Sequence, residues 1–145
     1  MKNIFLAGAC LLWMAGAAFA QNTSNVTQTG TTNTATVNQT GANTSDVDQN
    51  GANNNADVTQ SGASYSSVIQ LTSDNNSDVD QTGDGNDSYV YQEGTSNMAT
   101  VEQIGDNNSS SVNQIGDANV ATVLQGYFGA GGPDHVSTVD QSGIG

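Results

Sequence analysis

The sequence is poor in the residues on which most enzymes and nucleic-acid-binding proteins depend. Its 145 residues include one lysine and no arginine, and one each of cysteine, proline and histidine. Lys2 and Cys10 lie within the first 20 residues, and all 14 acidic residues follow them. Beyond residue 20 the chain has neither the cations that phosphate binding requires nor the thiols of a disulfide or thiolate metal site. We therefore expect no nucleic-acid partner.

The first 20 residues have the pattern of a secretory signal peptide. Lys2 precedes an apolar run that reaches Ala18, and Ala18-Phe19-Ala20 supplies the small residues that a signal peptidase recognises. We expect cleavage after Ala20 and one mature domain of residues 21–145. A lipoprotein signal that ends at Cys10 is the alternative. No later apolar run is long enough to cross a bilayer, so no membrane insertion is expected.

The scarcity of reactive side chains also argues against catalysis. His135 is the only histidine, and its neighbours Pro133 and Asp134 are typical of a loop. No nucleophile–base pair and no zinc ligand set can be assembled around it. The stretch 84–87 resembles a calcium loop but occurs once, so we interpret it as a turn. We expect no enzyme activity, no cofactor and no metal site.

A short repeat runs through the rest of the chain. In eleven units a valine is followed two residues later by glutamine, and in nine of them glycine comes two residues after that. The residue two before the valine is always serine or alanine. Successive units are 10 or 11 residues apart, except for a last step of 16 that contains a loop insertion at about residues 126–137. This regularity argues against the disorder that the polar composition alone would predict.

An eleven-residue period fits either three helical turns or a strand with a turn. Each unit carries glycine, asparagine and a β-branched residue, which are poor in helix interiors. Alternation with period two places serine or alanine, valine and glutamine on one face of a strand, and Gly-x-x-Asn supplies residues that accept left-handed backbone angles. The repeat predicts an all-β fold: a β-solenoid of strand-arc-strand rungs of about 22 residues, with alternate units in two parallel sheets and cross-β stacking in a fibre.

The repeated glutamines are expected to form a ladder in the solenoid core. A buried amide without partners costs about 1–3 kcal/mol. In a stack, each side-chain N–H can donate to the amide oxygen of the neighbouring glutamine, provided that the strands stay in register. The glutamines are Gln28, Gln39, Gln49, Gln60, Gln70, Gln81, Gln92, Gln103, Gln114, Gln125 and Gln141. The valines beside them are Val26, Val37, Val47, Val58, Val68, Val79, Val90, Val101, Val112, Val123 and Val139.

The repeat resembles that of the curlins, the subunits of curli, which are functional amyloid fibres of bacterial biofilms. Residues 99–125, "ATVEQIGDNNSSSVNQIGDANVATVLQ", match the curlin pattern Ser-x-Val-x-Gln-x-Gly-x-x-Asn-x-Ala-x-Val-x-Gln almost position for position. The resemblance covers residues 24–143. It implies a chain that is secreted to the bacterial cell surface and polymerises there. It also implies two partners, a nucleating minor curlin and a curli-type outer-membrane secretion pore.

Two classes of function are compatible with the repeat. The first is a structural subunit that assembles with itself into extracellular fibres for biofilm matrix and surface adhesion. The alternative is a monomeric or minor β-solenoid that nucleates fibres or acts as an adhesive binding module. The outward residues beside the valines do not repeat, whereas the inward ones do. This difference favours stacking over recognition of a repetitive ligand.

Four acidic residues are expected to form an outward carboxylate cluster. When the units are sorted onto two sheets, Asp57 stacks on Asp78 and Asp80 stacks on Glu102. Two unit charges about 4.8 Å apart in water repel by roughly 1 kcal/mol. Stacking should therefore raise carboxylate pKa values, and assembly should be favoured at lower pH.

Overall fold

The computed structural model describes residues 21–126 and 134–145. The expected signal peptide and most of the expected insertion lie outside these residues. The described chain consists of nine β-strands and contains no helix, hence none long and apolar enough to cross a membrane. The strands are β1 (Thr23–Thr31), β2 (Thr34–Gly41), β3 (Thr44–Ala52), β4 (Asn55–Ser73), β5 (Asn76–Thr95), β6 (Met98–Ile104), β7 (Ser109–Asp117), β8 (Val120–Gly126) and β9 (Val136–Ile144).

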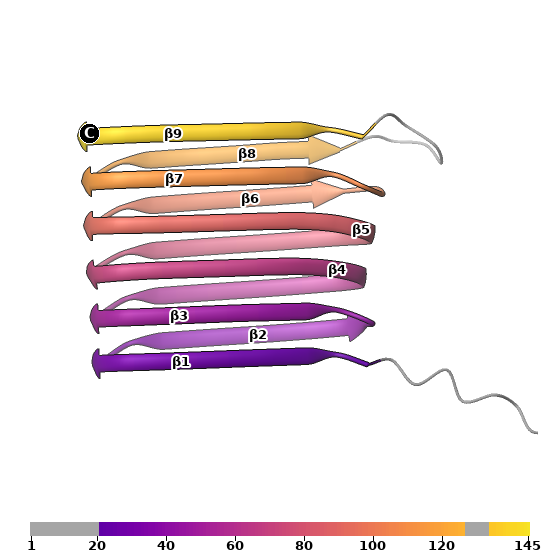
Figure 1. Cartoon of the computed structure of the whole chain (residues 1–145), viewed down its shortest axis with the longest axis horizontal. Coiled ribbons are helices and arrows are strands. Elements are labelled where there is room, and N and C mark those ends of the chain that lie inside the picture. Colours follow the sequence, from indigo (N-terminus) through magenta and orange to yellow (C-terminus); the bar gives the residue numbers. More distant parts are fainter. Residues whose placement is uncertain (1–20, 127–133) are drawn as a thin grey trace, which may run out of the picture.

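The strands wind into a solenoid in which every pairing is parallel (Figure 1). The long strands β4 and β5 each carry two units and pass through the arc between them. A front sheet contains β1, β3, the second halves of β4 and β5, β7 and β9. A back sheet contains β2, the first halves of β4 and β5, β6 and β8. The predicted β-solenoid of about 22-residue rungs is confirmed.

Strict alternation of side chains builds the core. Along β3 and β8, buried and exposed residues alternate, as expected when one face of each strand meets the other sheet. The buried apolar residues are valines and alanines, and no larger apolar side chain enters the core of the described residues. The two sheets therefore lie close together, and polar side chains fill the remainder of the space between them.

The arcs depend on backbone angles that few residues adopt. All nine glycines of the repeat have positive φ, between 102° and 138°. The asparagine that closes each unit does not share this conformation, so the prediction that it serves as a left-handed turn residue is wrong. The left-handed residue is instead the one before it, such as Asn53 or Ala118, with φ of 58° and 57°. The closing asparagine has a different role, which its side-chain contacts define.

Thr72 is strained because it occupies a glycine position. Its φ is 77°, a region that β-branched residues rarely adopt. Its Oγ1 accepts the backbone N–H of Gly94 at 3.1 Å, and its one hydroxyl hydrogen can be donated to the carbonyl oxygen of either Leu71 or Gly94. These bonds hold it in place. Residues forced into such angles cost on the order of 1–3 kcal/mol. The rung of Thr72 is therefore less stable than its neighbours.

Replacing Thr72 with glycine should stabilise the solenoid. We expect Thr72→Gly to raise the free energy of unfolding by about 1 kcal/mol, after allowance for the greater freedom of glycine in the unfolded chain. The matched control is Gly94→Thr on the adjacent rung, which should lower it. Chemical denaturation of the two variants checks both signs. A loss of stability in Thr72→Gly would show that its hydroxyl bonds outweigh its backbone strain.

Candidate functional site

The glutamine side chains form two continuous ladders, one within each sheet. Except for the last glutamine of each ladder, the side-chain Nε2–H donates to Oε1 of the glutamine in the next rung toward the C-terminus. The nine bonds are 2.7–2.9 Å long. The front ladder contains Gln28, Gln49, Gln70, Gln92, Gln114 and Gln141, and the back ladder contains Gln39, Gln60, Gln81, Gln103 and Gln125.

The second N–H of every glutamine after Gln28 joins the two sheets. It donates to the backbone carbonyl three residues before the valine of the preceding unit, as Gln49 does to Thr34 and Gln70 to Asn55. Ten such bonds are 2.8–3.2 Å long. Each of these glutamine amides thus bonds to glutamine in the neighbouring rung and to a backbone carbonyl of the facing sheet. Only the glutamine–glutamine bond was predicted. The second depends on how an arc positions a carbonyl, which a repeat pattern does not specify.

A second amide ladder runs along the arcs and was missed by the sequence analysis. Asparagine occupies the place two residues before the serine or alanine in nine of eleven units. Its Oδ1 accepts the backbone N–H of the equivalent residue in the next rung, at 2.9–3.1 Å. Asn75 also donates from Nδ2 to the carbonyls of Leu71 and Gly94, at 2.8 and 2.9 Å. The asparagines therefore close the arcs through their side chains.

Two units interrupt the asparagine ladder. Ser64 replaces asparagine, and its hydroxyl donates 3.0 Å to the carbonyl of Gly83 instead of accepting from the next rung. His135 takes the same place in the last unit, where its Nε2 is buried without a partner among the described residues. His135, whose neighbours predict a loop, is thus half-buried and lies in an arc. Both interruptions lie at the edge where the chain passes from the back sheet to the front.

The small residue two positions before each valine differs between the two sheets. All six front units carry serine, whereas the back units carry alanine except at Ser77. The buried hydroxyls of Ser45, Ser66, Ser77, Ser88 and Ser110 have no hydrogen-bond partner in the described structure. An unpaired buried hydroxyl costs about 1–3 kcal/mol. Ser77 is the one described back-sheet residue with such a hydroxyl, and its register partners on the two neighbouring strands are Ala56 and Ala99.

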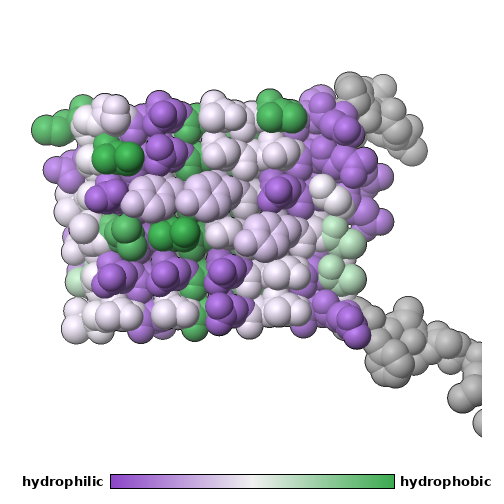
Figure 2. All heavy atoms as spheres, in the orientation of Figure 1, coloured by the Kyte–Doolittle hydropathy of each residue, from purple (hydrophilic) through white to green (hydrophobic). Residues whose placement is uncertain are grey.

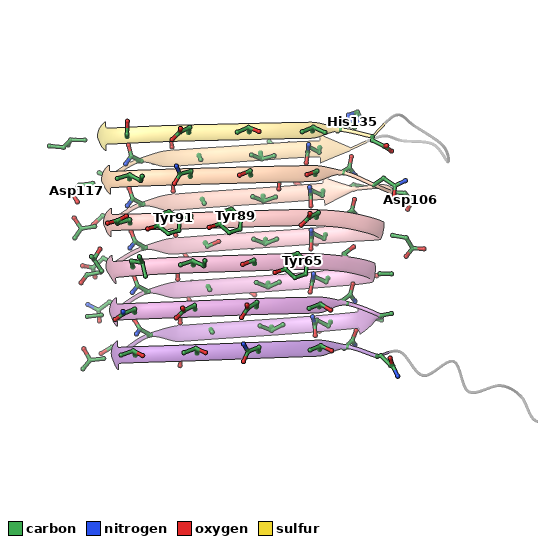
Figure 3. The ribbon with its side chains drawn as sticks, in the orientation of Figure 1. Tyr65, Tyr89, Tyr91, Asp106, Asp117 and His135 are labelled. Carbon is green, nitrogen blue, oxygen red and sulfur yellow. The ribbon has the colours of Figure 1, made fainter. Side chains whose placement is uncertain are left out.

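The outer surface lacks such regularity. On the front sheet, Ile69 stacks in register with Tyr91, and the side chains of Tyr65 and Tyr89 lie on the same face (Figure 3). Leu71 extends this apolar patch, which we define as Tyr65, Ile69, Leu71, Tyr89 and Tyr91. Figure 2 shows it as a central area of pale and green side chains on a mainly polar face. The front sheet thus combines a regular interior with an irregular exterior.

The four residues of the carboxylate cluster lie on the outer face of the back sheet in two registered pairs, Asp57 with Asp78 and Asp80 with Glu102. The pKa of Asp78 is raised from its ordinary value of 3.8, chiefly by partial burial and then by the charges of Asp57 and Asp80. Asp117, on an exposed arc, behaves in the opposite way. Its pKa is lowered because the hydroxyl and the backbone N–H of Thr95 both donate to Oδ1.

Both ends of the described solenoid present unpaired strands. At one end, β1 and β2 pair only with strands above them, and at the other, β8 and β9 pair only with strands below. Within the described residues, Oε1 of Gln28 and Gln39 accepts no bond at the first end. Gln125 and Gln141 each keep one unused N–H at the other. One end offers amide acceptors and the other offers amide donors.

Residues 72–105 match a family model, the curlin associated repeat. This segment runs from the strained Thr72 through the rungs of β5 and β6. No curated protein and no solved structure gave a significant match. No group of acidic, histidine or cysteine side chains suited to a metal ion occurs in residues 21–126 and 134–145. The repeat match supports assignment to the family that the sequence pattern resembles.

Interior glutamines should matter more for the stability of a single copy than terminal ones. Gln103 accepts from Gln81 and donates to Gln125 and to the carbonyl of Asp87, whereas Gln125 makes only two bonds. We expect Gln103→Ala to lower the free energy of unfolding of the monomer, measured by chemical denaturation, more than Gln125→Ala does, and Gln114→Ala to behave like Gln103→Ala. Thr100→Ala, an outward change in the strand of Gln103, is the control. Equal losses of stability for all three glutamine variants would contradict a cooperative ladder.

Removing the isolated hydroxyl of the back sheet should stabilise the chain. We expect Ser77→Ala to raise the free energy of unfolding by about 1 kcal/mol, because an unpaired buried group is lost and no large cavity forms. The reciprocal change Ala99→Ser, one rung away, should lower it by a similar amount. Denaturant midpoints of the two variants measure both effects. A destabilised Ser77→Ala would indicate that this hydroxyl has a partner in solution.

Two aspartates should give opposite pH dependences in the acid range. Since the folded pKa of Asp78 is raised, the folded chain binds more protons there than the unfolded chain. Its contribution to stability therefore falls as pH rises above 3.8 through the raised value. The lowered pKa of Asp117 makes its contribution fall as pH drops below 3.8.

Denaturation of Asp78→Asn and Asp117→Asn between about pH 2 and pH 6 separates these two contributions. We expect Asp78→Asn to lose less stability than the parent as pH rises above 3.8. Asp117→Asn should lose less as pH drops below it. Identical pH profiles for parent and both variants would show that neither carboxylate titrates as its surroundings imply.

Proposed function

We propose that this chain, assigned to the curlin family by its repeat, is a secreted structural subunit that assembles with itself into extracellular curli-like fibres. The matched repeat supports a curli-type amyloid subunit in general. Secretion to the cell surface and roles in biofilm matrix and adhesion are the finer parts of the proposal. We also propose a structural rather than catalytic role. Its proposed partners are further copies of itself, a nucleating minor curlin and a curli-type outer-membrane secretion pore.

The observation that carries the proposal is the chemistry of the two ends. A solenoid end with unpaired strands is a template for further strands. The terminal units at Val26 and Val139 contain no lysine or proline to prevent such pairing. The donors of Gln125 and Gln141 match the acceptors of Gln28 and Gln39. A second copy can therefore extend both amide ladders with the bonds that already hold one copy together.

The apolar patch on the front sheet favours a second candidate, an adhesive binding module. Tyr65 and Tyr89 remain 43% and 38% exposed on a mainly polar face. Exposed aromatic groups of this kind mark interaction surfaces more often than isolated apolar residues do. Adhesion and assembly use different faces, so a fibre can perform both. A monomeric binder would use the patch alone.

Assembly of the purified chain is the direct test. We expect the protein to sediment as fibres after a day at rest, and the fibres to give cross-β diffraction near 4.8 Å. Seeding with preformed fibres should shorten the lag, because every fibre end is a template. A chain that stays monomeric for days at high concentration would contradict the proposed role as a fibre subunit. The adhesive binding module would then be the remaining candidate.

A further inference from the structure

The two ends of the solenoid are stepped in the same way. The described residues contain six units in the front sheet and five in the back sheet. As Figure 1 shows, β1 and β9 both belong to the front, so the front sheet projects beyond the back sheet at each end. A copy stacked on this solenoid must meet a projecting front strand and a recessed back strand. How a copy can stack without a gap depends on these steps.

Stacking in the same orientation leaves one strand position empty. If β1 of a new copy pairs with β9, then β2 of that copy lies two strand spacings from β8, roughly 9.6 Å instead of 4.8 Å. The front ladder then continues from Gln141 to Gln28. In the back ladder, the donor of Gln125 and the acceptor of Gln39 remain separated by the vacant position. Every junction would carry unpaired backbone and side-chain amides.

We propose that successive copies are instead related by a half-turn about the solenoid axis, so that β1 of each copy pairs with β8 of the copy before it. β2 then pairs with β9. This inference rests on the proposed self-assembly and specifies its geometry. Front and back strands run in opposite directions in Figure 1. A half-turn therefore places a front strand onto a back strand with both chains running the same way, as the parallel pairing requires.

The half-turn continues both glutamine ladders across the junction. Gln125 of one copy donates to Gln28 of the next, and Gln141 donates to Gln39. Both junctions then repeat the Nε2–H to Oε1 bond that occurs nine times within a copy. Stacking in the same orientation completes one of these bonds and the half-turn completes two. No strand position is left empty.

The asparagine ladder also continues under this arrangement. Asn119 is 5% exposed, and within the described residues its Oδ1 accepts no hydrogen bond, although the equivalent oxygen of Asn97 accepts the backbone N–H of Asn119 at 3.0 Å. After a half-turn, Asn22 of the next copy enters the arc directly above Asn119, where its backbone N–H can donate to that oxygen. In the same-orientation stack, Asn22 lies instead above His135, at the other edge.

The arrangement determines the surface of the fibre. The front sheet of one copy continues into the back sheet of the next, so each side of the fibre alternates between the apolar patch and the carboxylate cluster. The carboxylate clusters of successive copies then lie on opposite sides of the fibre. Each copy occupies five and a half rungs, about 26 Å of fibre at the strand spacing, and the structure repeats after two copies.

Cross-linking through two engineered cysteines tests the half-turn. Asn25 on β1, Thr122 on β8 and Thr138 on β9 all precede a valine, point outward and are exposed. Residues paired in register lie about 4.8 Å apart, within disulfide range, whereas residues 25 and 122 of one copy are about five rungs apart. A disulfide between them must therefore join two copies.

The two variants to compare are Asn25→Cys/Thr122→Cys and Asn25→Cys/Thr138→Cys, each in the full chain with Cys10→Ser. After oxidation of the fibres, a non-reducing denaturing gel should show a series of covalent multimers for the first variant and monomers for the second. Multimers in the second variant, or in neither, would overturn the half-turn. Absence of fibres from the wild-type chain would instead overturn the proposed function itself.

A second set of outward positions provides the same test if the first pair of cysteine variants does not assemble. Thr27 on β1, Leu124 on β8 and Asp140 on β9 each follow a valine. The matched variants are Thr27→Cys/Leu124→Cys, expected to form multimers, and Thr27→Cys/Asp140→Cys, expected to remain monomeric. The opposite pattern, or no multimers in either variant, would contradict the half-turn in the same way.

Discussion

The hydrogen bond between stacked glutamine side chains is the interaction on which the rest of the structure depends. Each amide donates to the next rung and to a carbonyl of the facing sheet, so a one-residue slip of a strand would leave several buried polar groups unpaired. Register is therefore imposed by polar groups rather than by large apolar ones. This is why valine and alanine are sufficient for the apolar part of the core.

A thin core in turn restricts the arcs. Because the sheets lie close together, the chain must reverse direction within a few residues, and glycine with positive φ makes the first bend. The next bend uses a left-handed residue in the 11-residue steps. The 10-residue steps at Ala42 and Ala63 omit that residue, and the register shifts where the arc of Ala63 meets the longer arc at Gly85. Asparagine closes most arcs because its side chain bonds the backbone of adjacent rungs. Backbone angles and amide bonding thus account together for Gly-x-x-Asn.

Much of this fold could be predicted from spacing alone. The Val-x-Gln interval placed each unit in the correct sheet, and the pairings of Asp57 with Asp78 and Asp80 with Glu102 followed from that assignment. The role of the closing asparagine could not be predicted, because its side chain bonds a residue about 21 positions away, and composition favours asparagine in turns for other reasons as well. The strain at Thr72 could not be predicted either. When glycine is absent from the repeat, the sequence does not show whether the backbone changes its course or the new residue adopts the positive φ of glycine. The separation of serine and alanine between the sheets was visible in the sequence once the units were sorted.

The inward and outward positions of the solenoid are under different constraints. Since each end is a cross-section of the interior, the amides that hold one rung to the next are the same amides that would join one copy to another. A substitution at an interior glutamine therefore alters folding and joining together. An outward substitution, such as one in the apolar patch or at Asp78, leaves the ladders intact and alters the charge and apolar character of the surface. Charge and adhesive character can thus vary on the outer faces without changing the pattern that propagates along the axis. This division explains why the inward positions of the sequence are so regular while the outward positions follow no period.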